Sequence, residues 1–450
     1  MISYIHRALW SAMLAVWCLG PAMASDEPVV VDRATRDERE AFREKWQTRL
    51  PEIFSGQLTV DTESEWQGGF WAAGLTQDRS PMVRHAIAHA LATLPERSPA
   101  FRRAALEALH TLFPGEFTAE TEALLPTLDH PRLFAMAAYH VLRSPRMGPD
   151  SPAQLIRRER ARLFPEWQNH PILRMIDREL ERWWEHPRPP LEDLLRHEFL
   201  PGLPVIFSFQ RPDRRHPGLV MLRAADGRFA RHDTGELLAW PQLALSLSNM
   251  PGTITNGNTP QGLFSISGTG QATNVFIGPT PYIHSRLPHE VSLDDYMRRN
   301  GSGDSAEWSR ADYEMLLPES WREDASMFEA YEAGRAGRSE IIVHGTTINP
   351  AFYEGTSYYP MTPSLGCLCT IEIWSEDDGT AIRSDQRELV EAWKALPGAD
   401  RGGVLVVLEL AAEARPVELA DVLEAIARAE APPTNAHHDD ATPAMSDIEP

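Results

Sequence analysis

The segment Ile341–Cys369 reads IIVHGTTINPAFYEGTSYYPMTPSLGCLC; it opens with a β-branched run ending in His344 and closes on Cys367 and Cys369. The β-branched run predicts a strand. A cysteine attacks as its thiolate, and a free thiol with a pKa of about 8.5 is mostly protonated at neutral pH. It therefore needs a nearby base, and the pattern indicates a candidate catalytic pair of Cys367 and His344. The residues alone leave a second interpretation open, in which a core histidine and two buried cysteines end a strand.

The turn before Cys367 fits the same chemistry. Gly366 lets the chain turn tightly just before the nucleophile. That turn would aim the amides of Gly366 and Cys367 at a developing oxyanion, an interaction worth about 3–4 kcal/mol in other enzymes. The carbonyl of Gly345 is expected to orient the imidazole of His344 through its second nitrogen. The predicted reaction class is acyl transfer through a thioester.

Composition bounds the possible partners. The chain has 450 residues, enough for two or three domains with cores of their own. Its hydrophobic content of 42% and charged content of 24% are ordinary for a soluble protein. The net charge of −21 argues against nucleic acid as a partner, because nucleic-acid binding calls for basic patches.

The N-terminus has the pattern of an export signal. A short basic start and an apolar run over residues 8–20 precede Ala22-Met23-Ala24, a small-x-small cleavage site. We therefore predict a signal peptide over residues 1–24, whose removal leaves Cys367 and Cys369 as the only cysteines. No later stretch approaches about 20 uninterrupted apolar residues, so no membrane span is expected after signal removal. The predicted location is an oxidising, exported compartment, the periplasm.

Residues 33–197 are predicted to form helix after helix. Three helix starts place a polar residue before an early proline, at Ser80-Pro81, Ser98-Pro99 and His130-Pro131. Small apolar residues follow on one face of each helix, which lets paired helices approach closely. This region resembles HEAT-like helical repeats, which implies a surface for a protein partner. A plain helical cap on the next domain is the other interpretation.

A mainly β domain is predicted over residues 200–412. Strands are expected at 205–209, 219–223, 228–231, 263–267, 341–343, 368–374 and 404–410. Helices are expected at 292–299, 308–333 and 384–396. The tail over residues 432–450 has a composition typical of disorder.

Three motifs in order resemble the catalytic domain of the L,D-transpeptidase (YkuD-type) family. Members carry a TP-x-G-x-F-x-I segment, then a His-Gly, then a Ser-His-Gly-Cys box. The matching residues here are Thr259–Ile266, His344-Gly345 and Ser364-x-Gly366-Cys367. The likeness covers roughly residues 200–412. It implies an α+β multidomain fold in which an N-terminal α-helical (HEAT-like) domain precedes a mainly β L,D-transpeptidase-type catalytic domain.

The resemblance also implies roles for these residues. Cys367 would be the nucleophile, His344 the base, and the Gly345 carbonyl the group that orients the imidazole. Ser364 would support the loop, and amides near Gly366 would form the oxyanion site. The implied donor is a peptidoglycan stem tetrapeptide, attacked at the carbonyl of its L-centred third residue with release of D-alanine. Transfer to an amine would form 3–3 cross-links or attach a protein, without metal or organic cofactor.

Two positions depart from the family pattern. Leu365 replaces the histidine of the box, and Cys369 stands where an arginine that helps position substrate is common. These departures leave two alternatives open: an L,D-carboxypeptidase or endopeptidase that hydrolyses diaminopimelate linkages, and a catalytically degenerate peptidoglycan-binding protein. Cys369 is expected to be a free, partly buried thiol. An insertion over residues 278–339 is expected to shape or cover the cleft.

Overall fold

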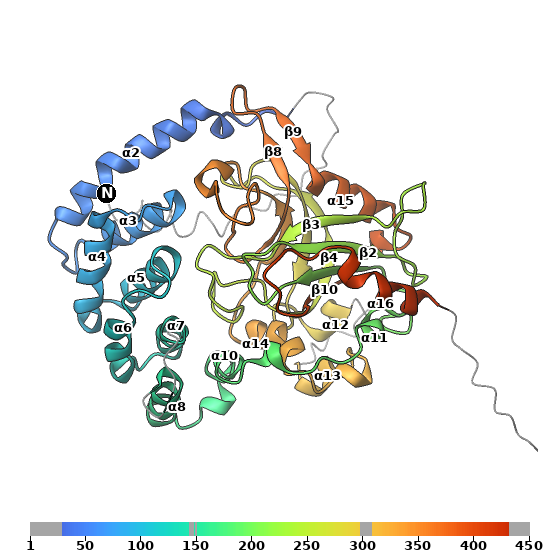
Figure 1. The fold of residues 1–450 in the computed structure, drawn as a ribbon, viewed down its shortest axis with the longest axis horizontal. Coiled ribbons are helices and arrows are strands. Elements are labelled where there is room, and N and C mark those ends of the chain that lie inside the picture. The colour runs from blue at the N-terminus through green and yellow to red at the C-terminus, as the bar shows by residue number, and fades with distance from the viewer. Residues whose placement is uncertain (1–28, 144–147, 149–150, 298–307, 432–450) are drawn as a thin grey trace, which may run out of the picture.

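The computed structural model describes residues 29–143, 148, 151–297 and 308–431. The predicted signal peptide and C-terminal tail lie outside these residues. The described chain is mixed helix and strand: helices fill its N-terminal part, and a closed β-barrel with further helices follows (Figure 1).

The N-terminal helices are α2 (Arg36–Ser55), α3 (Glu63–Thr76), α4 (Pro81–Ala92), α5 (Pro99–Leu112), α6 (Thr118–Leu124), α7 (Pro131–Val141), α8 (Pro152–Leu163), α9 (Pro171–Arg174), α10 (Asp177–Leu180) and α11 (Leu191–Leu195). The later helices are α12 (Leu293–Met297), α13 (Arg310–Glu314), α14 (Glu329–Arg335), α15 (Asp385–Ala395) and α16 (Ala420–Glu430). Short 3-10 helices include η7 (Ala325–Phe328) and η8 (Pro350–Tyr353). Figure 1 shows α2 to α8 as an arc along one side of the barrel.

The three predicted helix starts are confirmed by their caps. The side chain of Ser80 accepts a hydrogen bond from the amide of Val83, and Ser98 does the same at the start of α5. His130 caps α7 through its ring nitrogen. Proline takes the first helical position in all three helices, where its missing N–H costs nothing.

The barrel strands are β1 (Val205–Gln210), β2 (Gly218–Arg223), β3 (Ala239–Leu243), β4 (Gly262–Gln271), β5 (Pro281–Arg286), β6 (Ile342–Gly345), β7 (Leu368–Thr370) and β10 (Gly403–Glu409). They close in the order β1-β10-β4-β5-β6-β7-β3-β2. The pairs β1–β10 and β6–β7 are parallel, and the other neighbours are antiparallel. Strands β8 (Glu372–Trp374) and β9 (Ala381–Ser384) form a separate hairpin.

Strand residues alternate between two apolar cores, as the period of two along a strand requires. On β1, Val205 and Phe207 pack with α11 and α16, whereas Ile206 packs with Trp393 of α15. Every residue of β1 is buried, because helices or other strands cover both of its faces. The helical arc has a core of its own, which Met250 and Ile254 of the β3–β4 loop extend.

Several predicted elements differ in extent. The helix expected over 308–333 is broken into α13, two 3-10 turns and α14, with Pro318 and Asp324 at the starts of the two turns. The strand expected over 368–374 is two strands separated at Ile371. Residues 228–231 form isolated bridges rather than a strand.

The expectation that residues 278–339 form an insertion over the cleft is wrong for its ends. Strand β5 lies between β4 and β6 and is an integral part of the barrel. Ala330 and Ala333 of α14 are buried in the barrel core. Both ends of this segment therefore belong to the scaffold, although strand β5 carries little sequence signal.

Two helices near the predicted borders of the β region pack in its core. Helix α11 falls inside the predicted helical range, yet its Leu194 and Leu195 are buried in the same core as Val205. Helix α16 lies beyond the predicted end at residue 412, and its Val422 and Ile426 are buried in that core too. The two helices contact each other, and both pack against the barrel strands.

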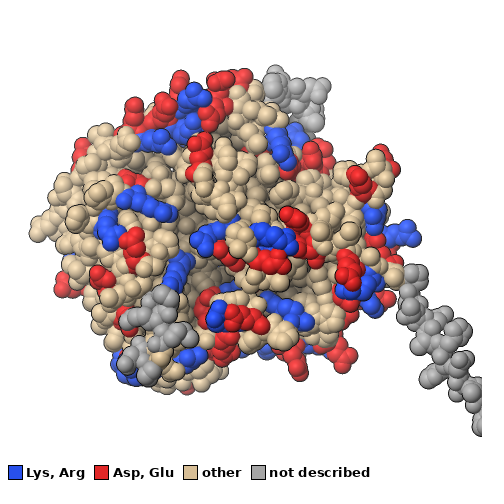
Figure 2. All heavy atoms as spheres, viewed as in Figure 1, with Lys and Arg blue, Asp and Glu red and all other residues tan. Residues whose placement is uncertain are grey.

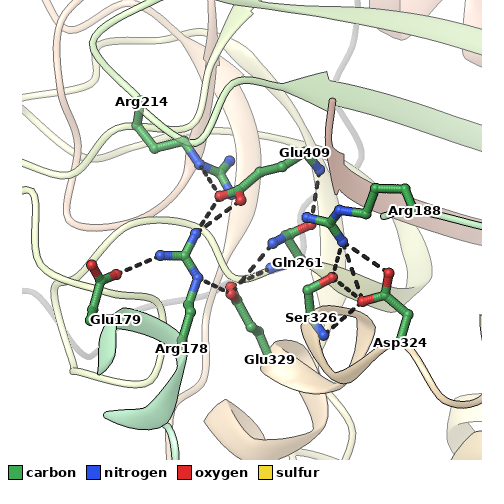
Figure 3. Close-up of polar contacts among 9 residues, drawn as sticks. All are labelled: Arg178, Glu179, Arg188, Arg214, Gln261, Asp324, Ser326, Glu329 and Glu409. Carbon is green, nitrogen blue, oxygen red and sulfur yellow. Dashed lines mark hydrogen bonds and ion pairs between the residues drawn. The ribbon is translucent and has the colours of Figure 1, made fainter. Parts of the chain in front are cut away.

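Ion pairs join helix α10, which follows the arc in the chain, to the barrel (Figure 3). Arg178 of α10 contacts Glu329 at the start of α14, Glu409 of β10 at 2.7 Å, and its neighbour Glu179 at 2.6 Å. Arg214 contacts Glu409 from the other side at 2.9 Å. Arg214, Glu329 and Glu409 are almost fully buried, and the side chains of Arg178 and Glu179 are 12% and 25% exposed, so the buried charges rely on their partners rather than on water.

Helix α2, at the start of the arc, contacts the loop of the β8–β9 hairpin. Arg36 and Arg39 of α2 pair with Glu376 next to β8 at 3.2 and 3.0 Å. Figure 2 shows a hollow on the viewed face between the arc and the barrel, with basic and acidic side chains near it. Within the described residues, none of the helices combines the length and apolar content that a membrane span requires.

Candidate active site

The register of two parallel strands sets the geometry of the site. His344 on β6 lies opposite Cys369 on β7, and Val343 lies opposite Leu368. Val343 and Leu368 are buried in the barrel core. Because successive side chains point to opposite faces of a sheet, His344 and Cys369 share the face away from that core.

His344 is held in one orientation by its own backbone neighbour. Its Nδ1 is 2.6 Å from the carbonyl oxygen of Gly345 and donates to it, which leaves Nε2 as the acceptor of the neutral ring. Burial lowers the pKa of His344 to about 4, and the hydrogen bond to Gly345 opposes that shift. The imidazole is therefore neutral at pH 7. The contact expected from the sequence is present.

The thiol that touches this imidazole belongs to Cys369. Its sulfur lies 3.7 Å from Nε2 and 3.9 Å from Nδ1 of His344. Cys369 is fully buried, and burial raises the pKa of its thiol well above the ordinary value. The two described cysteines are free thiols, as expected for Cys369, although Cys369 is more deeply buried than predicted.

Cys367 is half-buried and points elsewhere. Its sulfur contacts the carbonyl oxygen of Glu340 at 3.8 Å. Burial raises the pKa of the Cys367 thiol, whereas the amide of Ile342 and the guanidinium of Arg338 lower it. Within the described structure, no hydrogen bond joins Cys367 to His344. The predicted pair therefore shares one region of the barrel but is not in contact in this structure.

The turn before Cys367 is built as the sequence indicates, with one difference. Gly366 has φ = +112°, a conformation that favours glycine. Ser364 Oγ accepts from the Gly366 amide at 3.0 Å and donates to the Cys367 carbonyl at 2.8 Å. Ser364 thus holds the loop. The Gly366 amide, however, is engaged in the turn and does not face outward as an oxyanion donor, which leaves the Cys367 amide as the candidate.

The three motifs meet in space. Thr259, which opens the TPQGLFSI segment, donates from Oγ1 to the Gly366 carbonyl at 2.9 Å. Leu263 and Phe264 of the same segment pair with β10 in the barrel. The order of motifs in the sequence therefore corresponds to one connected region around the Cys367 turn.

Two residues of this region were missed by the sequence analysis. Arg338 is buried against Gly366 and donates to backbone carbonyls of the β3–β4 loop. Glu372 is buried beside Gly345 and accepts from Ser384 Oγ at 2.7 Å; burial raises its pKa to about 7. A guanidinium group thus lies beside Gly366 and a carboxyl group beside Gly345, and neither residue belongs to a local sequence motif that would have predicted it.

The departures at positions 365 and 369 have different surroundings. Leu365 is 37% exposed on the turn beside Cys367, where it can meet a ligand. Cys369 is buried against His344 and cannot. In the part of the chain that the structure describes, no group of three or more His, Cys, Asp or Glu side chains could hold a metal ion. No family model, curated protein or solved structure matches the chain.

Proposed function

We propose that the protein is a cysteine-dependent L,D-transpeptidase that acts on peptidoglycan stem peptides in the periplasm. The observation that carries the proposal is the Cys367 turn beside His344. A half-buried thiol follows a left-handed glycine, and the nearby imidazole is neutral with its tautomer fixed by the Gly345 carbonyl. A neutral imidazole whose Nε2 carries no proton is the form that accepts one.

In the proposed reaction, the Cys367 thiol turns from Glu340 toward His344 and gives its proton to Nε2, directly or through one water. The sulfur attacks the carbonyl carbon of the third stem residue, and a C–S bond forms. The tetrahedral intermediate collapses to a thioester as the D-alanine amine leaves with the proton from His344. An acceptor amine then attacks the thioester carbon, and His344 takes a proton from the amine. A C–N amide bond forms, the C–S bond breaks, and His344 returns the proton to the sulfur.

A second candidate is a degenerate protein that binds peptidoglycan without turnover. The observation that favours it is the contact of His344 with Cys369, together with the raised pKa of the Cys367 thiol. Catalytic hydrogen bonds in ligand-free enzymes are often long and tighten when substrate binds, so the separation of Cys367 from His344 is compatible with catalysis.

The test is incubation of the full exported chain with disaccharide tetrapeptide, followed by mass spectrometry of the products. Cross-linked dimer supports transfer to an amine, and tripeptide alone supports the carboxypeptidase alternative. Absence of both products, with muropeptide binding retained, supports the binding protein.

The matched variants are Cys367→Ala and Cys369→Ala, which remove thiols two residues apart. Cys367→Ala is expected to abolish turnover and thioester formation while leaving folding intact. Cys369→Ala is expected to retain a larger share of turnover, because its thiol is shielded from substrate. Equal loss in both variants would refute Cys367 as the specific nucleophile.

We also propose that the helical arc is a HEAT-like array that binds a protein partner. Its support is the recurring capped helix start and the curved arrangement in Figure 1. Capture of a cell-envelope partner by the full chain, and its loss when exposed residues on α4 or α6 are changed, would test this role.

A further inference from the structure

Arg338 carries a positive charge into the region of the Cys367 turn. Only 4% of the residue is exposed. Its guanidinium donates to the carbonyls of Gly257 and Asn258, each at 2.6 Å, and to that of Gly252. All three acceptors lie in the β3–β4 loop.

No carboxylate within the described residues forms an ion pair with Arg338. Burial lowers its pKa to about 10, so the guanidinium is still charged at neutral pH. Backbone carbonyls satisfy its donors but supply no negative charge. A buried charge of this kind is costly unless an opposite charge can form nearby.

The guanidinium also packs directly against the glycine that precedes the nucleophile. A Cβ atom placed on Gly366 would lie 1.8 Å from Nη2 of Arg338 and 2.5 Å from the Gly257 carbonyl oxygen. Thr259 ties the Gly366 carbonyl to the same loop. Glycine is thus favoured at position 366 both by its φ and by the close approach of Arg338.

We propose that Arg338 is a positioning residue that holds the Gly366 turn and stabilises the thiolate of Cys367 with its buried charge. The thiolate would add to the negative charge of Glu329, which acts on the guanidinium without forming an ion pair with it. The carboxyl group of Glu340 opposes the thiolate, so Arg338 acts against it. In this structure, His344 contacts Cys369 and does not activate Cys367. Arg338 would then be the group that favours the Cys367 thiolate in this state. The inference rests on the proposed function only in giving the thiolate a role; the charge effect itself is measurable without substrate.

The test is the pH dependence of Cys367 alkylation by iodoacetamide in the full chain, with peptide mass spectrometry that separates Cys367 from Cys369. Arg338→Gln keeps hydrogen-bond donors but loses the charge, and it should move the midpoint of the rate up by about one pH unit or more. Arg338→Lys keeps the charge and should stay closer to the unsubstituted protein. Thr259→Val loosens the same turn without changing charge and should leave the midpoint in place.

The proposal is overturned if Arg338→Gln folds and leaves the midpoint unchanged, or if Thr259→Val shifts it as far. Gly366→Ala changes the other partner of the Arg338–Gly366 contact and replaces the arginine variants in the test if those fail to fold. Its new methyl group displaces the guanidinium, so an upward shift supports the proposal and no shift opposes it. A shifted midpoint in a protein without turnover would refute the proposed function while leaving the role of Arg338 intact.

Discussion

Replacement of Arg178 by methionine should strongly destabilise the packing of helix α10 on the barrel. The guanidinium contacts three carboxylates, and Figure 3 shows it between Glu329 and Glu409. Without Arg178, Glu409 still pairs with Arg214. Glu329 loses the only charged partner that Figure 3 shows for it. It keeps the hydrogen bond that the backbone amide of Gln261 donates at 3.0 Å. Removing one partner of a buried ion pair costs about 3–5 kcal/mol, because the other charge stays buried.

The assay is urea unfolding followed by tryptophan fluorescence, with Arg428→Met as the matched control. Arg428 pairs with Glu192 at 3.2 Å, but its side chain is 50% exposed, so its loss should cost no more than about 1 kcal/mol. Adding Glu329→Gln to Arg178→Met should recover part of the loss, since the orphaned charge is then removed. The reasoning is refuted if Arg178→Met costs no more than Arg428→Met, or if the second substitution recovers nothing.

The remaining predictions concern the site. Burial lowers the pKa of His344 from 6.5 to about 4, so the unfolded chain binds the extra proton and His344 destabilises the protein as pH falls through this window. His344→Gln should therefore lose about 3 kcal/mol less than the unsubstituted protein between pH 7 and 4 in urea unfolding; equal losses would contradict this. Glu372 has the opposite sign, because its pKa is raised from 4.5 to about 7 and the folded state holds the proton. The free energy of unfolding of the unsubstituted protein should therefore fall by about 3 kcal/mol because of Glu372 as pH rises through that window, and Glu372→Gln should not show this fall. An unchanged dependence of the unfolding free energy on pH would contradict this. Gly345→Ala should cost about 1–3 kcal/mol in thermal unfolding, because its Cβ would lie 2.3 Å from Glu372 Oε2. Glu372→Ala in the same chain should relieve that cost, and its failure to do so would place the strain elsewhere.

The sequence predicted what short-range chemistry controls. A serine before a proline caps a helix through contacts within one turn, and the caps at Ser80 and Ser98 formed as expected. The hydrogen bond between His344 and Gly345 is equally local. Strand β5 could not be found this way, because Pro281–Arg286 becomes a strand through pairing with β4 and β6. Arg338 was missed for the same reason: its acceptors lie about eighty residues earlier in the chain.

The residue at position 369 has a contact within the site that the sequence did not indicate. An arginine there would bear on substrate, so its loss was expected to alter recognition. Cys369 instead lies opposite His344 in the ladder and is fully buried against the imidazole. The Cys369 thiol therefore helps to set the position of the His344 imidazole. Cys367 precedes Cys369 by two residues, which corresponds to about 6.5 Å along an extended chain. The positive charge that position 369 lacks is present nearby in Arg338, buried against the Gly366 turn. In the proposed reaction, transfer of the Cys367 proton requires movement of the thiol or the imidazole, and the proposed role of Arg338 is to lower the energy of the thiolate that forms.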